Sequence, residues 1–228
     1  MIIDVTDPRN PVEKALIPAP TGGQAQMARM CLGSQLTGDP NNKKVYLQRN
    51  VQGGASSGYQ VWDVTDVSAP VMTASLVGIR STHKQWWECN TGLMFAPGSK
   101  NAAPLWRQSQ SLLVYDWKNP NAAPVYIRTF GLPGAQPGST ATVATSLHGA
   151  ISVHEHPKAS QALAAWTNAG VAPGDNVVGN RIYAAWGVGD NGVMTIIDRK
   201  KLLPAAYGGT WNGANPDSPT EAELIGPG

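Results

Sequence analysis

The sequence predicts an all-β protein that consists of a run of β-propeller blades, and three observations support this prediction. A strand-and-turn motif recurs along the chain. Glycine at 25 positions and proline at 18 indicate many turns. Hydrophobic residues make up 42% of the chain and charged residues only 14%, which is typical of a globular protein with short strands.

The recurring motif has two apolar residues, an aspartate, a polar turn and, in most copies, a proline. The copies are IIDVTDPRNPV at 2–12, VWDVTDVSAPV at 61–71, VYDWKNPNAAPV at 114–125 and the looser IIDRKKLLPA at 196–205. We interpret the apolar pair as the end of a strand. Each aspartate can accept a hydrogen bond from the backbone amide two residues on, which forms an Asx turn. These structural turn residues are Asp4, Asp63, Asp116 and Asp198.

The spacing of the motif predicts the blade boundaries within one domain, 1–228. Propeller repeats run ~40–50 residues with four strands per blade. We expect a half blade at 1–20 and full four-stranded antiparallel blades at about 24–79, 80–132 and 145–226. The outermost strands fall at 71–77, 125–130 and 223–225. The last unit is longer because 157–180 lacks strand alternation, which predicts a loop insert with a short helix after Ser160.

Three and a half blades do not close a propeller, because known propellers need about four or more. We therefore expect the chain to be a truncated part of a larger protein, or to be completed by missing blades or a second copy. Open sheet edges also predict self-association or low stability for the chain by itself.

At the recurring motifs the chain resembles the LVIVD-repeat proteins, a bacterial β-propeller family. The resemblance also covers KQWWECNTG at 84–92, RTFGLPGAQPG at 128–138, LHGAIS at 147–152 and GVMTIIDRKKLL at 192–203. It implies a propeller fold and an exported, periplasmic or extracellular, origin. It carries no catalytic residues over to this chain.

Charge and apolar patterning exclude two classes of partner. The net charge is +2 and no basic block stands out, so we expect no nucleic-acid binding. No apolar run approaches the ~20 residues of a membrane helix, and no signal peptide precedes the first strand. For Cys31 and Cys89 we favour two buried free thiols over one disulfide.

Histidines are the candidate metal ligands, with Zn or Cu as the metals that imidazole suits. His83 and His148 each head the first strand of a blade, and first strands line a propeller channel, so we expect both imidazoles at one end near the axis. The favoured alternative is a channel-lining histidine bonded to a backbone carbonyl. His154 and His156 share a strand face and could chelate a metal, against the favoured interpretation of a solvated loop.

The segment 86–90 contains the other ligand-binding candidates. Alternation places Trp86 and Glu88 on one face, as a ligand platform, and Trp87 and Cys89 on the other, as packing residues. No nucleophile motif such as GxSxG or HExxH occurs.

Two functions follow from these features. The first is a repeat scaffold that binds a protein or small ligand outside the cytoplasm. The alternative is a metal-dependent, oxidoreductase-like propeller enzyme with channel-lining histidines, so the sequence leaves open whether the protein is an enzyme.

Overall fold

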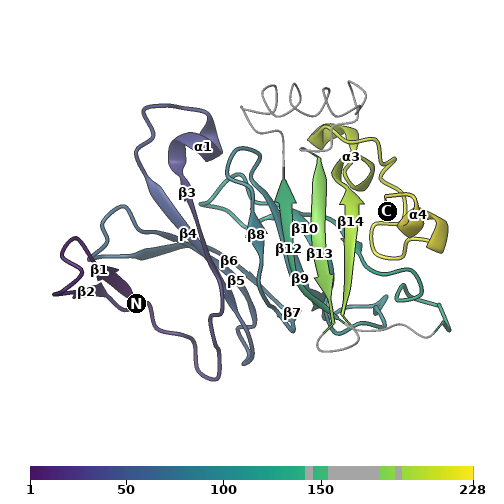
Figure 1. The fold of residues 1–228 in the computed structure, drawn as a ribbon, viewed down its shortest axis with the longest axis horizontal. Helices are drawn as coiled ribbons and strands as arrows, with labels where there is room; N and C mark the ends of the chain where they lie inside the picture. Colours follow the sequence, from purple (N-terminus) through teal and green to yellow (C-terminus); the bar gives the residue numbers. More distant parts are fainter. Residues whose placement is uncertain (142–145, 154–179, 188–191, 228) are drawn as a thin grey trace.

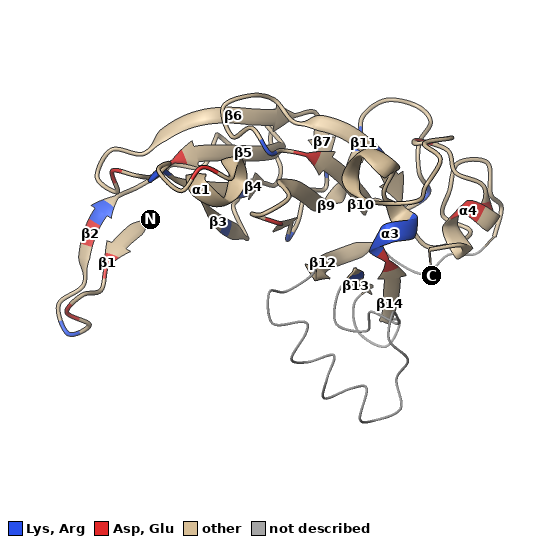
Figure 2. Cartoon of the chain, turned by 90° about the horizontal axis from the view of Figure 1, so that it is seen from above, with Lys and Arg blue, Asp and Glu red and all other residues tan. Residues whose placement is uncertain are grey.

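The computed structural model describes residues 1–141, 146–153, 180–187 and 192–227. The described chain is all-β, and its strands form several antiparallel sheets, none of which closes on itself. The sheets follow one another in sequence order from the N-terminal hairpin at one end to the C-terminal helices at the other (Figure 1). Seen from above, the edge strands β6 and β11 lie along one long side of the molecule, and β12 to β14 lie on the other (Figure 2).

Each sheet is a meander of consecutive strands, apart from the split edge of the middle one. The hairpin comprises β1 (Ile2–Asp4) and β2 (Val12–Ala15). The first sheet comprises β3 (Ala28–Leu32), β4 (Val45–Val51), β5 (Gly58–Asp63) and β6 (Val71–Val77), with α1 (Gly33–Thr37) after β3. The middle sheet comprises β7 (Ile79–Arg80), β8 (Trp86–Trp87), β9 (Leu93–Lys100), β10 (Ser111–Asp116) and β11 (Val125–Phe130). The last sheet comprises β12 (Leu147–Val153), β13 (Arg181–Trp186) and β14 (Val193–Asp198).

The turns after the recurring motif form as predicted. Strands β1, β5, β10 and β14 each end at the motif aspartate. The carboxylate accepts from the backbone amide two residues on, at 2.9 Å for Asp4, 3.0 Å for Asp63, 2.9 Å for Asp116 and 2.9 Å for Asp198. The Asx-turn prediction is therefore confirmed at all of these positions.

Replacing Asp63 or Asp116 with alanine should lower the free energy of unfolding by about 1 kcal/mol, the usual value of a local side chain-to-backbone hydrogen bond. Asparagine at the same position retains the acceptor oxygen and should restore most of the loss. Urea unfolding of the three forms measures both effects. Equal stability of the alanine and asparagine variants would show that the turn bond contributes nothing.

The middle sheet packs on both of its faces. Met94 and Ala96 of β9 belong to a core that the first sheet shares, together with Tyr59 and Val61 of β5. Leu93 and Phe95 point to the opposite face. They belong to a second core, which the last sheet completes with Ile182, Ala184, Trp186 and Ile197. Strand β9 is thus apolar on both faces, and its alternate side chains pack against the first sheet on one side and the last sheet on the other.

The edge strand next to β9 is split into two pieces. β7 pairs with the end of β9 at Lys100 and Ser99, and β8 pairs further along at Phe95 and Met94. The break at 81–85 begins at Ser81, whose φ of 53° lies in the left-handed region. His83 and Lys84 fall within this break, so they are not held in strand pairing with β9.

The predicted last strand at 223–225 is wrong, because this segment forms helix α4 (Glu221–Ile225). Its capping residue Thr220 accepts from the Glu223 amide at 3.3 Å, and the Glu223 carboxylate accepts from the Thr220 amide at 2.7 Å. This capping box is written in the sequence as T-x-x-E and outweighs the short apolar pair that suggested a strand. Leu224 inserts into the core beside the last sheet, which has three strands among the described residues. Two short elements precede α4: α3 (Arg199–Leu202) and a 3-10 turn, Ala205–Tyr207.

The expectation of free thiols is also wrong, because Cys31 and Cys89 form a disulfide. Cys31 lies on β3 of the first sheet and Cys89 follows β8 of the middle sheet, with their Cα atoms 5.2 Å apart. That separation lies within the range that a disulfide spans. Two thiols that the packing of neighbouring sheets brings this close can pair, and the bond then ties the sheets together.

Two expectations meet the limits of the described chain. The predicted loop insert at 157–180 lies outside the described residues except for its last residue, Asn180. Within the described part of the chain, no helix has the length and apolar character needed to cross a membrane.

Candidate functional site

Glu88, a predicted ligand-binding residue, lies in a buried ion pair. Its carboxylate accepts from Arg199 Nη2 at 2.7 Å and from Arg199 Nε at 3.0 Å. Thr91 Oγ1 donates to the same carboxylate at 2.6 Å, and Ser152 Oγ donates to it as well. The two charged side chains are 5% and 2% exposed. The carboxylate is therefore already engaged by the protein, and the structure gives Glu88 a role in joining the middle sheet to the last.

Trp86 and Trp87 point to opposite sides of the chain, as strand alternation predicts. Trp87 is buried in the core between the first and middle sheets. Trp86 packs against the other core and remains partly accessible. The guanidinium of Arg29, from β3, lies 4.2 Å from the centre of the Trp86 ring. A cation therefore covers the ring face that we had expected to serve as a platform.

His83 and His148 lie together, as their equivalent places ahead of two strands predict, whereas their position near a propeller axis stays a prediction. Their ring centroids are 4.5 Å apart, and His83 Nδ1 is 2.9 Å from the backbone oxygen of His148. The carbonyl can only accept, so His83 Nδ1 carries the proton when the ring is neutral. Burial lowers the pKa of His83, and the bond to the His148 carbonyl opposes this effect only in part. The imidazole is therefore neutral near pH 7, with an unprotonated Nε2.

No third metal ligand joins this pair in the part of the chain that the structure describes. No group of three or more His, Cys, Asp or Glu side chains gathers there in a way that could hold a metal ion. The other candidate metal ligands, His154 and His156, lie outside the described residues. Bonding of His83 to a backbone carbonyl is the alternative that the sequence favoured.

Beside the histidines a pocket of about 320 Å³ opens between the first and last sheets, and we call it the inner pocket. Its wall combines inner-strand residues of the first sheet, the break at 81–85 and the outward face of the last sheet. It is lined by Met27, Arg29, Lys84, His148, Gly149, Ala150, Ile151, Tyr183, Ala184, Ala185 and Met194.

The apolar side of the inner pocket comes from the outward face of the last sheet. Ile151 pairs with Tyr183 across β12 and β13, and Ala185 pairs with Met194 across β13 and β14. Ile151 is 49% exposed and Met194 is 68% exposed. These side chains offer an open apolar surface, which makes the pocket suited to a ligand with an apolar body.

The polar side of the inner pocket is cationic. Arg29 is held in place by the stacking on Trp86 and by an Nε bond to the Gln85 carbonyl at 3.4 Å. Lys84 is held through its backbone, which bridges Gly149 of β12 in parallel. The Lys84 ammonium has no ion-pair partner among the described residues, and none of the described residues that line the pocket is acidic. The arrangement can therefore attract an anionic group to one end of an apolar cavity.

Sequence reasoning found His148 but missed Arg29, Lys84 and Tyr183. A signal was present, because Arg29, Lys84 and His148 occupy or adjoin the inner edge strands of successive sheets. A basic residue near each inner strand indicates a shared electropositive surface. Tyr183 lines the pocket because it lies on the face of β13 that points away from the core. The residue pattern of β13 alone does not show which of its faces packs against the core.

Comparison of the chain with models of known protein families gives no match, and comparison with curated proteins gives no significant match either.

Proposed function

We propose that this protein is a non-catalytic β-propeller-type scaffold of the LVIVD-repeat kind, and that it binds a small amphipathic anion in the inner pocket. Meander sheets whose strands end in one repeated Asx turn support the propeller assignment. The observation that carries the ligand assignment is the pairing of an open apolar wall with the cations Arg29 and Lys84 in one pocket.

The ligand class follows from the two sides of the pocket. A carboxylate or similar anion can accept from the Arg29 guanidinium and the Lys84 ammonium, and such charge-assisted bonds are about twice as strong as neutral ones. An alkyl or aromatic body can cover Ile151, Tyr183 and Met194. A volume of about 320 Å³ lies at the lower end of the range for small-molecule sites, so the ligand is small.

The disulfide supports an extracytoplasmic location for this activity. Disulfides persist in oxidising compartments and are rare where thiols are kept reduced. The proposed site of action is therefore the periplasm or the cell exterior, where a scaffold meets small organic anions from the surroundings.

Binding of decanoate, titrated into the full chain by isothermal calorimetry, tests the proposal. Replacing Arg29 and Lys84 together with glutamine should weaken decanoate binding by about tenfold or more, because at least one charge-assisted hydrogen bond of roughly 1.5–3 kcal/mol is lost. Lys201→Gln is the matched control: the exposed Lys201 lies on α3, outside the pocket, and this variant should bind like the parent.

Decanol separates the two parts of the recognition, because it has the same apolar body without the charge. Decanol should bind the parent more weakly than decanoate does. Its affinity for the Arg29/Lys84 variant should equal its affinity for the parent. Equal binding of decanol and decanoate to the parent would contradict an anion site, as would full decanoate affinity in the double variant.

A metal-dependent enzyme is the second candidate, and the contact between His83 and His148 is the observation in its favour. Titration of the full chain with Zn²⁺, compared with a His83→Gln/His148→Gln variant, tests it. Tight binding in the parent that the variant loses would support this candidate. Equal weak binding by both forms would count against it.

A further inference from the structure

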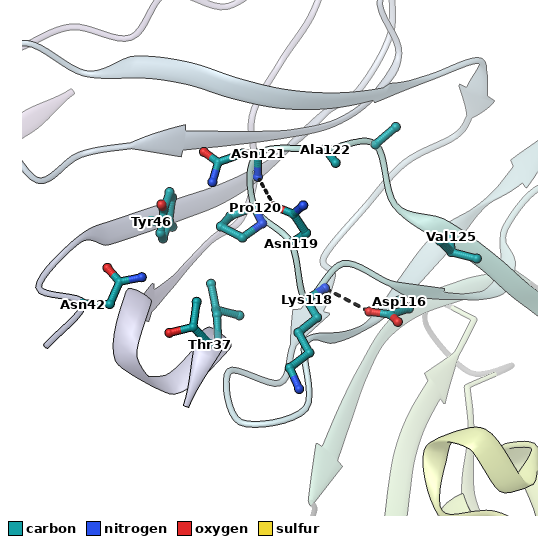
Figure 3. Close-up of a pocket in the computed structure, with 12 residues that line it drawn as sticks. Thr37, Asn42, Tyr46, Asp116, Lys118, Asn119, Pro120, Asn121, Ala122 and Val125 are labelled. Atoms are coloured by element: carbon teal, nitrogen blue, oxygen red, sulfur yellow. Dashed lines mark hydrogen bonds between the residues drawn. The ribbon is translucent and has the colours of Figure 1, made fainter. Parts of the chain in front are cut away.

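A larger pocket lies away from the inner pocket, between the first sheet and the turn after β10. Its volume is about 520 Å³. Thr37 of α1, Asn42 and Tyr46 form one side, and the turn of residues 116–125 forms the other (Figure 3). No sequence motif indicates this pocket, because it arises where a loop of one sheet meets a turn of the next.

The turn that forms one wall is rigid. The Asp116 carboxylate accepts from the Lys118 amide at 2.9 Å, and Asn119 Oδ1 accepts from the Asn121 amide at 3.0 Å. Trp117 is buried and its Nε1 donates to the Ala122 carbonyl at 2.9 Å. Two consecutive Asx turns and a buried indole therefore fix the backbone of this wall.

The opposite wall is fixed through Asn42. Asn42 Oδ1 accepts from the Lys44 amide at 3.2 Å. The side chain lies against Gly33, where an added Cβ would come within 2.2 Å of Asn42 Oδ1. Only glycine at position 33 leaves room for this orientation. Both walls are thus set before any ligand arrives, which reduces the entropic cost of binding.

The structural hydrogen bonds use the oxygen atoms of these amides and leave their nitrogen atoms free. Asn42 and Asn119 each accept one backbone bond through Oδ1, while their Nδ2 groups donate to no atom of the described chain. The side chain of Asn121 makes no hydrogen bond there either, and it is exposed. Figure 3 shows these carboxamides on both sides of the pocket. The pocket therefore presents several unused amide donors to a ligand.

The charges of the lining cancel. Among the described residues, Lys118 and Asp116 are its charged residues, one of each sign, whereas the described lining of the inner pocket has cations and no acid. Tyr46, Pro120 and Val125 add apolar surface between the polar groups. Amide donors, a carboxylate acceptor and apolar patches complement a ligand whose hydroxyl groups both donate and accept around a C–H framework.

We propose that this pocket binds a neutral saccharide. The ring and hydroxyl oxygens accept from Asn42, Asn119 and Asn121, and a hydroxyl donates to Asp116. The proposal is independent of the inner pocket, since the two sites share no lining residue.

Maltose, cellobiose and lactose, titrated separately into the full chain and followed by saturation-transfer NMR, test the proposal. We expect at least one of them to bind. Asn42→Asp/Asn119→Asp keeps the oxygen that each turn requires and removes the free amide donors. It should therefore weaken binding by about tenfold or more with an unchanged melting temperature. Asn41→Asp makes the same chemical change at an exposed neighbour outside the pocket and should bind like the parent.

Three results would overturn the proposal. The first is that none of the three disaccharides binds the parent. The second is that the Asn42/Asn119 variant binds as tightly as the parent. The third is that glucuronate binds more tightly than glucose, which would make the pocket an anion site. Decanoate binding, which reports only on the inner pocket, distinguishes failure of this proposal from failure of the proposed function.

Discussion

Reducing the Cys31–Cys89 disulfide should destabilise the chain by about 4 kcal/mol, the largest effect that we expect from a single bond. The two cysteines are 58 residues apart in sequence, and closing a loop of that length removes much conformational entropy from the unfolded chain. For a chain of this size each kcal/mol corresponds to a shift of roughly 2–4 °C in the melting temperature. Thermal unfolding with and without dithiothreitol measures the shift directly.

The control for this experiment is a Cys31→Ser/Cys89→Ser variant. It should melt at the same temperature with and without dithiothreitol, close to the melting temperature of the reduced parent. If the parent also melts at one temperature in both conditions, the bond does not stabilise the fold and the argument for an oxidising compartment loses its basis.

Glu88→Gln should cost about 3–5 kcal/mol, because it leaves the Arg199 guanidinium buried without a countercharge. Glutamine keeps the shape of the side chain but only one of its two oxygens. Thr91 donates to Oε2 and Ser152 to Oε1, so one of these hydroxyl groups faces an NH2 group and loses its acceptor. The loss therefore reports on the charge and its hydrogen bonds and not on a cavity. Urea unfolding gives the change in the free energy of unfolding.

A second variant isolates the charge. In Glu88→Gln/Arg199→Met neither side chain is ionised, so the double variant should recover a large part of the stability that the single variant loses. A single variant as stable as the parent would contradict the prediction. A double variant less stable than Glu88→Gln would show that packing by Arg199 matters more than pairing.

Local features of the fold could be predicted from the sequence. Asp63 and Asp116 end their strands as expected, because an Asx turn depends only on a side chain and the backbone two residues away. A local error, the strand predicted at 223–225, arose because two apolar residues were weighed without the T-x-x-E signal at Thr220 and Glu223.

Features that depend on packing between sheets could not be predicted. The partner of Glu88 is Arg199, 111 residues further along the chain, and nothing in the local pattern connects the two. Cys31 and Cys89 likewise meet only once the first and middle sheets have packed.

The candidate sites show the same division. The proximity of His83 and His148 could be predicted from their equivalent places ahead of two strands. The pockets could not, because each forms between segments from different sheets whose separation the sequence does not record. In the sequence, Asn42 and Asn119 look like ordinary turn residues. Only the packing of the sheets places their side chains on opposite sides of one pocket.

The double-sided packing of the middle sheet also bears on how the chain opens. The last sheet and the first sheet each rest on it, through separate apolar clusters. The last sheet has no disulfide to the middle sheet among the described residues, so it can detach in a local fluctuation while the first sheet keeps its core, but loss of the middle sheet exposes both clusters at once. Opening of the middle strands β9 and β10 therefore requires nearly global unfolding, and their amides should be the slowest in the molecule to exchange with solvent. The inner pocket, whose wall includes the outward face of the last sheet, then loses its apolar side whenever that sheet opens.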